Sequence, residues 1–598
     1  MADDNRDKWY RLPKVSFNKR ILTNRMRKVE GATIKHAHKF IIKRWSNVRE
    51  VQWHITLWIL AMGVLIAVTG LQLMWYQQSY LVAAPDRNGT YAEAVLGPID
   101  TLNPLFSSTS AERSSAYLMF SSLLQYDKTG HLNYDLATGV KISDANTVYT
   151  VSIRPDAKWH DGVQLTAKDV AFTINLMKNP NVRTAISGWK DISVKVIDDK
   201  TISFKLPAIY AAFEHALTFP IVPEHILGGI APSSIRENAY SQNPIGSGPF
   251  KLNFIQNVTV SAGRKVVYMA RNDDYYGGVA KLARFQLHAY NTSDDIIHAL
   301  NLSEVNAAAD LSPADITGID TKRYSVTSQS VQSGVYAILN TKSATLKDIS
   351  IRSALRLATD TKAILNKLPS ATKPLELLFT NGQLTGAIPK APGFNLESAK
   401  KVLDDNGWKL NKNGIREKDG KQLKLSVVTM KDSEFEHVLD ILSGQWCALG
   451  ITINTHVLDP NDVTQNVVQN ILQPRNFDVL LYQYNIGADP DVYAYWHSSQ
   501  ATPQGSNFSN YSNVISDEAL TSARARVEPT LRNAKYITFA KQWLSDVPAI
   551  ALYQSTAQYV TSNNVHSFDN SNVLITPIDR YSDVLNWSAG TRSVYKTP

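Results

Sequence analysis

The sequence is poor in cysteine: Cys447 is the single thiol in 598 residues. A chain with one cysteine forms no internal disulfide, so its stability must come from hydrophobic cores, which a chain of this length can build. Because Cys447 lies in an apolar helix-to-strand stretch, we expect it to be a small buried residue.

Several catalytic motifs are also missing. The chain has no Gly-x-x-x-x-Gly-Lys-Ser/Thr run for nucleotide phosphates and no Gly-x-Ser-x-Gly elbow of a serine hydrolase. It has no His-Glu-x-x-His or Cys-x-x-Cys pair for zinc. We therefore expect no enzyme, no cofactor and no resident metal, although an acid pair of a glycosidase has no fixed spacing to search for.

Excess charge is absent from most of the chain. Residues 1–50 hold fourteen Lys or Arg and five Asp or Glu, which accounts for the whole formal net charge of +9. The other residues hold equal numbers of positive and negative side chains. These totals suggest no basic surface for nucleic acid. The excess belongs to an N-terminal tail, which either contacts anionic headgroups or only fixes topology.

No Asp, Glu, Lys or Arg occurs between Glu50 and Asp86. Trp53 and Trp75 are 22 residues apart, which on a helix is about 33 Å and matches a hydrocarbon core with an aromatic residue at each interface. We predict a transmembrane helix over residues 51–76. Lysine and arginine precede it, so residues 1–50 are expected in the cytoplasm and residues 77–598 outside.

A cleaved signal peptide is the alternative to an anchor. Val82-Ala83-Ala84 resembles a cleavage site, but the basic region is long, the apolar run exceeds a signal core, and Pro85 would follow the cut. We favour an uncleaved anchor. A lipoprotein anchor would need a cysteine here, and none is present.

The outer part has the pattern of a mixed α/β protein. A linker is expected over residues 77–89. Strands are predicted over 194–196, 201–206, 423–429 and 451–457, and helices over 167–177, 347–365 and 435–449. In the first of these helices, Thr166 is the expected N-cap and Asp169 completes a capping-box pattern.

A series of segments carries a family resemblance. Residues 149–173 read YTVSIRPDAKWHDGVQLTAKDVAFT, and residues 243–250 read NPIGSGPF. Further elements are Leu102-Asn103-Pro104, Leu136-Ala137, and Asp546-Val547-Pro548. In order and spacing, over residues 90–560 or so, these resemble the extracellular solute-binding proteins of the oligopeptide, dipeptide and nickel importers. Most of the signature also has a structural role, such as the turn at Gly162.

The resemblance implies a two-lobed clamp of the periplasmic-binding-protein type, class II, large and with an extra subdomain, preceded by one transmembrane helix. The domains expected are a tail (1–50), the helix (51–76), the linker (77–89) and lobe I (90–330). Lobe I would carry an inserted subdomain over about 113–225; lobe II would span 331–555, with a return to lobe I over 556–598.

The resemblance also points to a binding loop at residues 482–496, YQYNIGADPDVYAYW. The family's acid for a peptide amino terminus lies four residues before the proline, where this sequence has Ile486. Asp489 and Asp491 are the nearby substitutes, unless they only form the turn around Pro490. Further candidate cleft residues are Tyr482, Tyr484, Asn485, Trp496 (a core position is its alternative) and Ser107.

The function expected from this resemblance is capture of a peptide, or a similar small solute, outside the cell and its delivery to an ABC permease and ATPase. The protein would be a monomer in the cell membrane, single-pass, with its binding domain extracellular or periplasmic. A membrane-anchored receptor that signals through the basic tail is the first alternative. An extracellular peptidase or glycosidase is the second.

Overall fold

The computed structural model describes Lys35, Lys39 and residues 45–184, 186, 188–259, 264–369, 371–459, 462 and 464–595. It divides into two compact units, residues 1–84 with 593–598 and residues 85–592. Most of the predicted basic tail, residues 1–50, lies outside the described residues.

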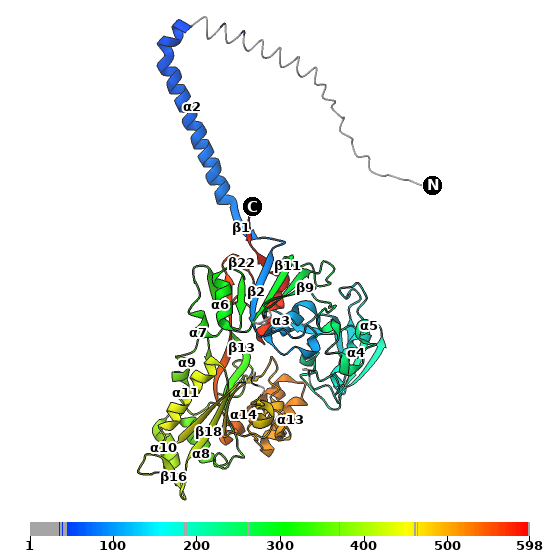
Figure 1. Ribbon diagram of the computed structural model, residues 1–598, viewed down its shortest axis with the longest axis vertical. Coiled ribbons are helices and arrows are strands. Elements are labelled where there is room, and N and C mark those ends of the chain that lie inside the picture. The colour runs from blue at the N-terminus through cyan, green and yellow to red at the C-terminus, as the bar shows by residue number, and fades with distance from the viewer. Residues whose placement is uncertain are drawn as a thin grey trace, which may run out of the picture. The chain divides into compact units, whose positions relative to one another are not determined.

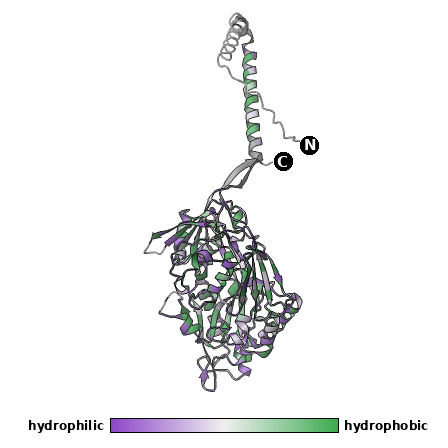
Figure 2. Ribbon diagram, turned by 90° about the vertical axis from the view of Figure 1, so that its right-hand side faces the viewer, coloured by the Kyte–Doolittle hydropathy of each residue, from purple (hydrophilic) through white to green (hydrophobic). Residues whose placement is uncertain are grey.

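The first unit is dominated by one long helix, α2 (Trp45–Tyr80). Its segment Val51–Tyr76 has a mean hydropathy of 2.1 and no buried side chain, and it is long enough to cross a membrane. Figure 2 shows apolar residues along this helix. The helix continues into the segment expected as a linker, and strand β1 (Leu81–Pro85) follows and pairs with β24 (Thr591–Tyr595).

The second unit is built on one mixed sheet of eleven strands (Figure 1). Its longest strands, β13 (Tyr324–Leu339) and β21 (Ala549–Ser562), lie antiparallel through the middle. Their register shifts between Ser330 and Gly334, where β13 also begins to pair with β20 (Val479–Asn485). These two strands therefore connect two lobes, with β12, β2, β11, β10 and β9 on the lobe I side and β20, β18 and β19 on the lobe II side.

The other strands of the central sheet have these bounds: β2 Thr90–Leu96, β9 Phe250–Thr259, β10 Arg264–Arg271, β11 Arg284–Tyr290, β12 Ala307–Ala309, β14 Lys373–Pro374, β18 Lys424–Met430 and β19 Thr452–Leu458. Among the smaller sheets are one of β15 (Lys409–Leu410), β16 (Arg416–Lys418) and β17 (Lys421–Gln422), and one of β22 (Val565–His566) with β23 (Ser588–Ala589).

An inserted subdomain lies between β2 and β9 in the sequence. Its antiparallel sheet has the order β5–β6–β8–β7, and the buried core spans residues 123–221, with Trp159, Phe204 and Phe213 among its members. The bounds are β3 Leu124–Tyr126, β4 Leu132–Tyr134, β5 Ala137–Ile142, β6 Val148–Ile153, α4 Ala167–Lys178, β7 Ser193–Asp198, β8 Thr201–Lys205, η3 Phe213–Leu217 and α5 Glu224–Leu227.

Helices cover both lobes. Lobe I has η2 Pro104–Phe106, α3 Ser110–Met119, η4 Pro232–Ser234, η5 Ala239–Ser241, α6 Ser293–Asn301, α7 Pro313–Ile316 and η8 Pro577–Asn586. Lobe II has α8 Ile349–Leu357, α9 Thr361–Leu365, α10 Leu396–Asp405, α11 Ser433–Cys447, η6 Val468–Leu472, α12 Tyr493–Trp496, η7 Ser498–Gln500, α13 Val514–Arg524 and α14 Pro529–Asp546. Separate hydrophobic cores lie on the two faces of the lobe II sheet.

Several sequence expectations are confirmed. The predicted strands and the helices over 167–177 and 435–449 correspond to β7, β8, β18, β19, α4 and α11. Thr166 and Asp169 form the expected capping box. Gly162 has a φ of +90° in the predicted turn, a backbone conformation that favours glycine. Gly246 is required for a different reason, since an added Cβ would lie 1.9 Å from the carbonyl oxygen of Met119.

Two expectations are wrong. The single helix predicted over 347–365 is two helices, α8 and α9, because the Asp360 side chain accepts hydrogen bonds from the amides of Lys362 and Ala363 and so starts a new helix. Cys447 is exposed, not buried. It is the last residue of α11, and the core contact falls on the neighbouring Trp446.

Candidate functional site

A cavity of about 240 Å³ lies where the two lobes meet, and we call it the interlobe cavity. Strand β21 contributes Ser555 to Gln558, lobe I contributes Asp310, Ser312 and Arg580, and lobe II contributes Asp432, Glu434 and Gln483. A solute held here would contact both lobes at once. Such a contact is what couples binding to closure of a two-lobed protein.

The charged groups around the interlobe cavity are held by protein partners. Asp432 caps α11, and Glu434 accepts a hydrogen bond of 2.8 Å from the Tyr553 hydroxyl. Burial raises the pKa of Glu434 above its ordinary value, and the Tyr553 hydrogen bond offsets part of that rise. Arg580 is bound to Glu93 at 2.7 and 3.0 Å, so this buried pair fixes η8 against β2.

A larger cavity, of about 480 Å³, lies within lobe I and its inserted subdomain, and we call it the lobe I cavity. The start of η8 separates the two, since Pro577 and Arg580 line the interlobe cavity while Ile578 and Tyr581 line the lobe I cavity. Its volume is within the range of small-molecule sites. Its walls combine prolines and aromatic rings with the hydroxyls of Ser107, Tyr117, Ser121, Ser122 and Ser582.

Three of these hydroxyls, on Ser107, Tyr117 and Ser582, are buried and have no hydrogen-bond partner among the described residues. Buried hydroxyls are normally paired, so the cavity offers unused hydrogen-bonding capacity to a solute. Asp135 also lines it and accepts hydrogen bonds from the Tyr276 hydroxyl and the Ser122 amide. Burial raises the pKa of Asp135 to about 6, although these hydrogen bonds and Arg154 oppose the rise.

Of the seven candidate residues from the sequence, Ser107 lines one of these two cavities. Two others face the lobe II core. Trp496 has no exposed surface and packs on Trp543, with 5.6 Å between ring centroids. Tyr484 is 2% exposed, and its hydroxyl donates to the Ser506 carbonyl. Both rings are enclosed by lobe II itself, and the ligand contact expected of them stays a prediction.

Tyr482 and Asn485 lie beside that core, on the same strand. Tyr482 is half-buried and packs edge-on against Phe508, with 5.4 Å between ring centroids. Asn485 is exposed, and its side-chain oxygen accepts a hydrogen bond from Ser333 on β13. Their role toward a solute stays a prediction.

Asp489 and Asp491 both have arginine partners. Arg532 binds both oxygens of Asp489, and Arg524 binds Asp491 with its Nε and Nη2 at 2.9 Å each. Burial alone would lower the pKa of Arg532, but the hydrogen bond and charge of Asp489 raise it above its ordinary value. Both turn carboxylates thus already have a cationic partner.

Sequence reasoning missed Tyr117, Asp135 and Ser582. Asp135 directly precedes the quoted Leu136-Ala137 element, but nothing in the sequence indicates that its carboxyl is buried against a cavity. Tyr117 and Ser582 come from α3 and η8, which are more than 450 residues apart, and tertiary packing brings them together. No group of three or more His, Cys, Asp or Glu is placed to hold a metal ion in the described part of the chain.

Comparison with known proteins identifies relatives with this architecture. The family model of bacterial extracellular solute-binding proteins, family 5, matches residues 131–506. Oligopeptide-binding protein AppA of Bacillus subtilis is 25% identical over 502 residues, which cover 81% of this chain and 89% of AppA. The structure of AppA with a nonapeptide has a TM-score of 0.71 at 23% identity and covers 85% of this chain and 100% of that one.

A second solved structure has a ligand of another kind. NikZ from Campylobacter jejuni in complex with Ni(L-His) has a TM-score of 0.70 at 24% identity and covers 83% of this chain and 99% of that one. Two lobes joined by long central strands, a cavity between them and the family match agree with one another. The chain belongs to family 5 of the bacterial extracellular solute-binding proteins, the solute-capturing components of ABC transporters.

Proposed function

We propose that this protein captures peptides, or a similar small solute, between its lobes and hands them to an ABC permease driven by its ATPase, without catalysing a reaction. The observation that carries the proposal is the interlobe cavity at the crossing strands, lined by residues of both lobes. The adjacent lobe I cavity, with its unpaired hydroxyls, would take side chains of the bound solute.

Peptides are the preferred class because AppA, which matches 81% of this chain, is an oligopeptide-binding protein. Strand-like backbone hydrogen bonding with loose side-chain pockets would allow many sequences to bind. Relatives of this kind do not favour the alternative of a membrane-anchored receptor that signals through the basic tail. We further propose that the chain is a monomer, anchored by Val51–Tyr76 with its N-terminus in the cytoplasm.

The test is mass spectrometry of solute released by denaturation from the full chain purified in detergent. A ladder of short peptides is the expected result. A single non-peptide compound would overturn the peptide assignment, and failure to bind any peptide mixture by calorimetry would overturn the proposal itself.

A matched pair of variants locates the site. Gln483 is exposed on β20 and lines the interlobe cavity, so Gln483→Trp should fill the cavity and abolish binding. Lys424 is exposed on the neighbouring β18 and does not line it. Lys424→Trp should therefore bind as the unmodified protein does.

A further inference from the structure

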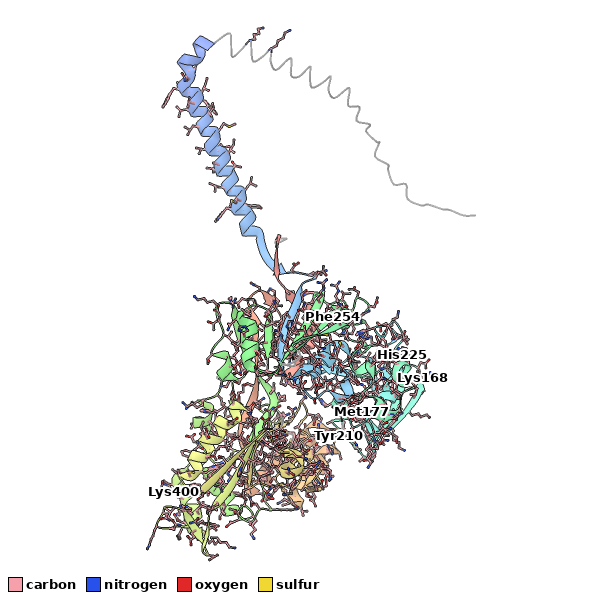
Figure 3. The ribbon with its side chains drawn as sticks, viewed as in Figure 1. Lys168, Met177, Tyr210, His225, Phe254 and Lys400 are labelled. Atoms are coloured by element: carbon pink, nitrogen blue, oxygen red, sulfur yellow. The ribbon has the colours of Figure 1, made fainter. Side chains whose placement is uncertain are left out.

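The two lobes touch each other directly at Arg524, the last residue of α13. Its guanidinium lies between two tyrosine rings, 4.8 Å from the centroid of Tyr210 and 4.3 Å from that of Tyr493. Tyr493 belongs to lobe II, whereas Tyr210 belongs to the inserted subdomain. The Ala211 amide also donates a 3.0 Å hydrogen bond to the Arg524 carbonyl. Figure 3 labels Tyr210 where the inserted subdomain faces lobe II.

Arg524 is held in place from its own lobe. Asp491, whose side chain is 6% exposed, binds the guanidinium from one side while Tyr493 packs on it. Burial tends to lower the pKa of Arg524, but Asp491 raises it above its ordinary value, so the group stays charged. A cation fixed in this way needs only a ring from the other lobe to complete its surroundings.

We propose that Arg524, held by Asp491, is a closure latch, and that Asp489 and Asp491, each bound to an arginine, do not hold the amino end of a solute. The loop that would bind a ligand ammonium here carries two arginines in its place, Arg532 on Asp489 and Arg524 on Asp491. Arg524 then reaches across to Tyr210. The statement about solute rests on the proposed function, while the latch itself does not.

The physical consequence concerns the balance between open and closed forms. The Tyr493 and Asp491 contacts lie within lobe II and persist when the lobes separate, but the Tyr210 contact exists only in the closed form. An interaction present in one state alone shifts the equilibrium toward that state. A cation–π contact of this kind changes the ratio of closed to open protein by about two- to thirtyfold.

The latch is tested by the distance between the lobes in the full chain, without added solute. Spin labels are placed at two exposed positions, Lys195→Cys on β7 and Lys541→Cys on α14, after the exposed Cys447 is changed to serine. Mass spectrometry first verifies that no solute remains bound. We expect a dominant short distance in the parent protein, and Tyr210→Ala should move population to longer distances.

Two further variants separate a latch from a general loss of packing. Tyr210→Phe keeps the ring over Arg524 and should retain the short distance. Tyr493→Ala removes the ring on the lobe II side and should change the distribution less than Tyr210→Ala. Equal distance distributions for the parent and Tyr210→Ala would overturn the latch, whether or not the protein binds solute.

The solute statement has its own measurement. A tryptic digest of serum albumin, half of it acetylated at the amino ends with an isotopic label, is offered to the full chain, and bound peptides are counted by mass spectrometry. We expect free and acetylated peptides to be recovered equally. A preference of about tenfold or more for free amino ends would overturn this part, since a charge-assisted hydrogen bond is worth that much. Recovery of no peptide would count against the proposed function and leave the distance result standing.

Discussion

At the scale of single residues, Asp135 in the wall of the lobe I cavity makes the free energy of unfolding depend on pH. Its pKa of about 6 is above the value near 3.9 of an unfolded chain. Because the folded protein keeps a proton that the unfolded chain releases, the free energy of unfolding falls as pH rises from about 4 to about 6. Above about pH 6, Asp135 no longer contributes this stabilisation.

Asp135→Asn removes this dependence, because an amide does not titrate. Relative to the parent protein, we expect the variant to gain about 2–3 kcal/mol in free energy of unfolding between pH 4 and pH 7. Urea unfolding of both proteins at each pH measures the difference. Asp144→Asn, at an exposed turn, is the control, and its free energy of unfolding should change with pH as that of the parent does. The same pH dependence in Asp135→Asn and the parent would contradict the prediction.

Asp489 and Arg532 form a second residue-scale test. Their side chains are 13% and 12% exposed, so removing either partner leaves the other charge nearly buried and unpaired. Asp489→Asn and Arg532→Gln should each lower the free energy of unfolding by about 3 kcal/mol or more. The double variant should lose clearly less than the sum of the two in chemical unfolding, and additive losses would show that the pair does not act as a unit.

At the scale of elements, the loop before α3 is organised by one buried carboxylate. Glu112, 1% exposed, accepts hydrogen bonds from the amides of Asp100, Thr101, Ser108 and Thr109 and from the Ser108 hydroxyl. It therefore fixes the segment that presents Ser107 to the lobe I cavity. Between these anchored residues, the Asn103 side chain accepts a hydrogen bond from the Leu105 amide and caps η2.

Replacing this carboxylate should loosen the loop. Glu112→Gln keeps one acceptor oxygen but turns an amide group toward backbone donors, so we expect a loss of about 3 kcal/mol and faster hydrogen exchange at residues 100–109. Glu397→Gln changes a first-turn glutamate of α10 that is 82% exposed. That control should leave stability and exchange unchanged, and equal exchange at 100–109 in both variants would count against the role of Glu112.

Elements also show what the sequence could and could not predict. The capping box at Thr166 and the turn at Gly162 depend on local hydrogen bonds and backbone angles. Residues adjacent in the sequence determine both, so the sequence predicts them. The break between α8 and α9 was missed because apolar spacing continued across Asp360. The partners of Asp489 and Asp491 lie more than thirty residues away on α13 and α14, so no local pattern indicates them.

At the scale of the whole molecule, the remaining question is whether α2 stays attached. The possible cleavage site Val82-Ala83-Ala84 lies in β1, which pairs with β24 at the other end of the chain. Cleavage after Ala84 would remove nearly all of β1 and leave the backbone groups of β24 without their strand partner. Unpaired edge strands are a liability in folded proteins, so the pairing favours an uncleaved anchor.

The prediction is that the mature protein keeps its first 84 residues. Its intact mass from isolated membranes should agree with the full 66.5 kDa, and it should stay in the membrane pellet after alkaline carbonate. A chain that begins at Pro85 should instead be found in the soluble fraction, because it lacks the apolar segment Val51–Tyr76. If the mature protein itself began at Pro85, the helix would be a signal sequence, and the binding domain would be released to diffuse to its permease.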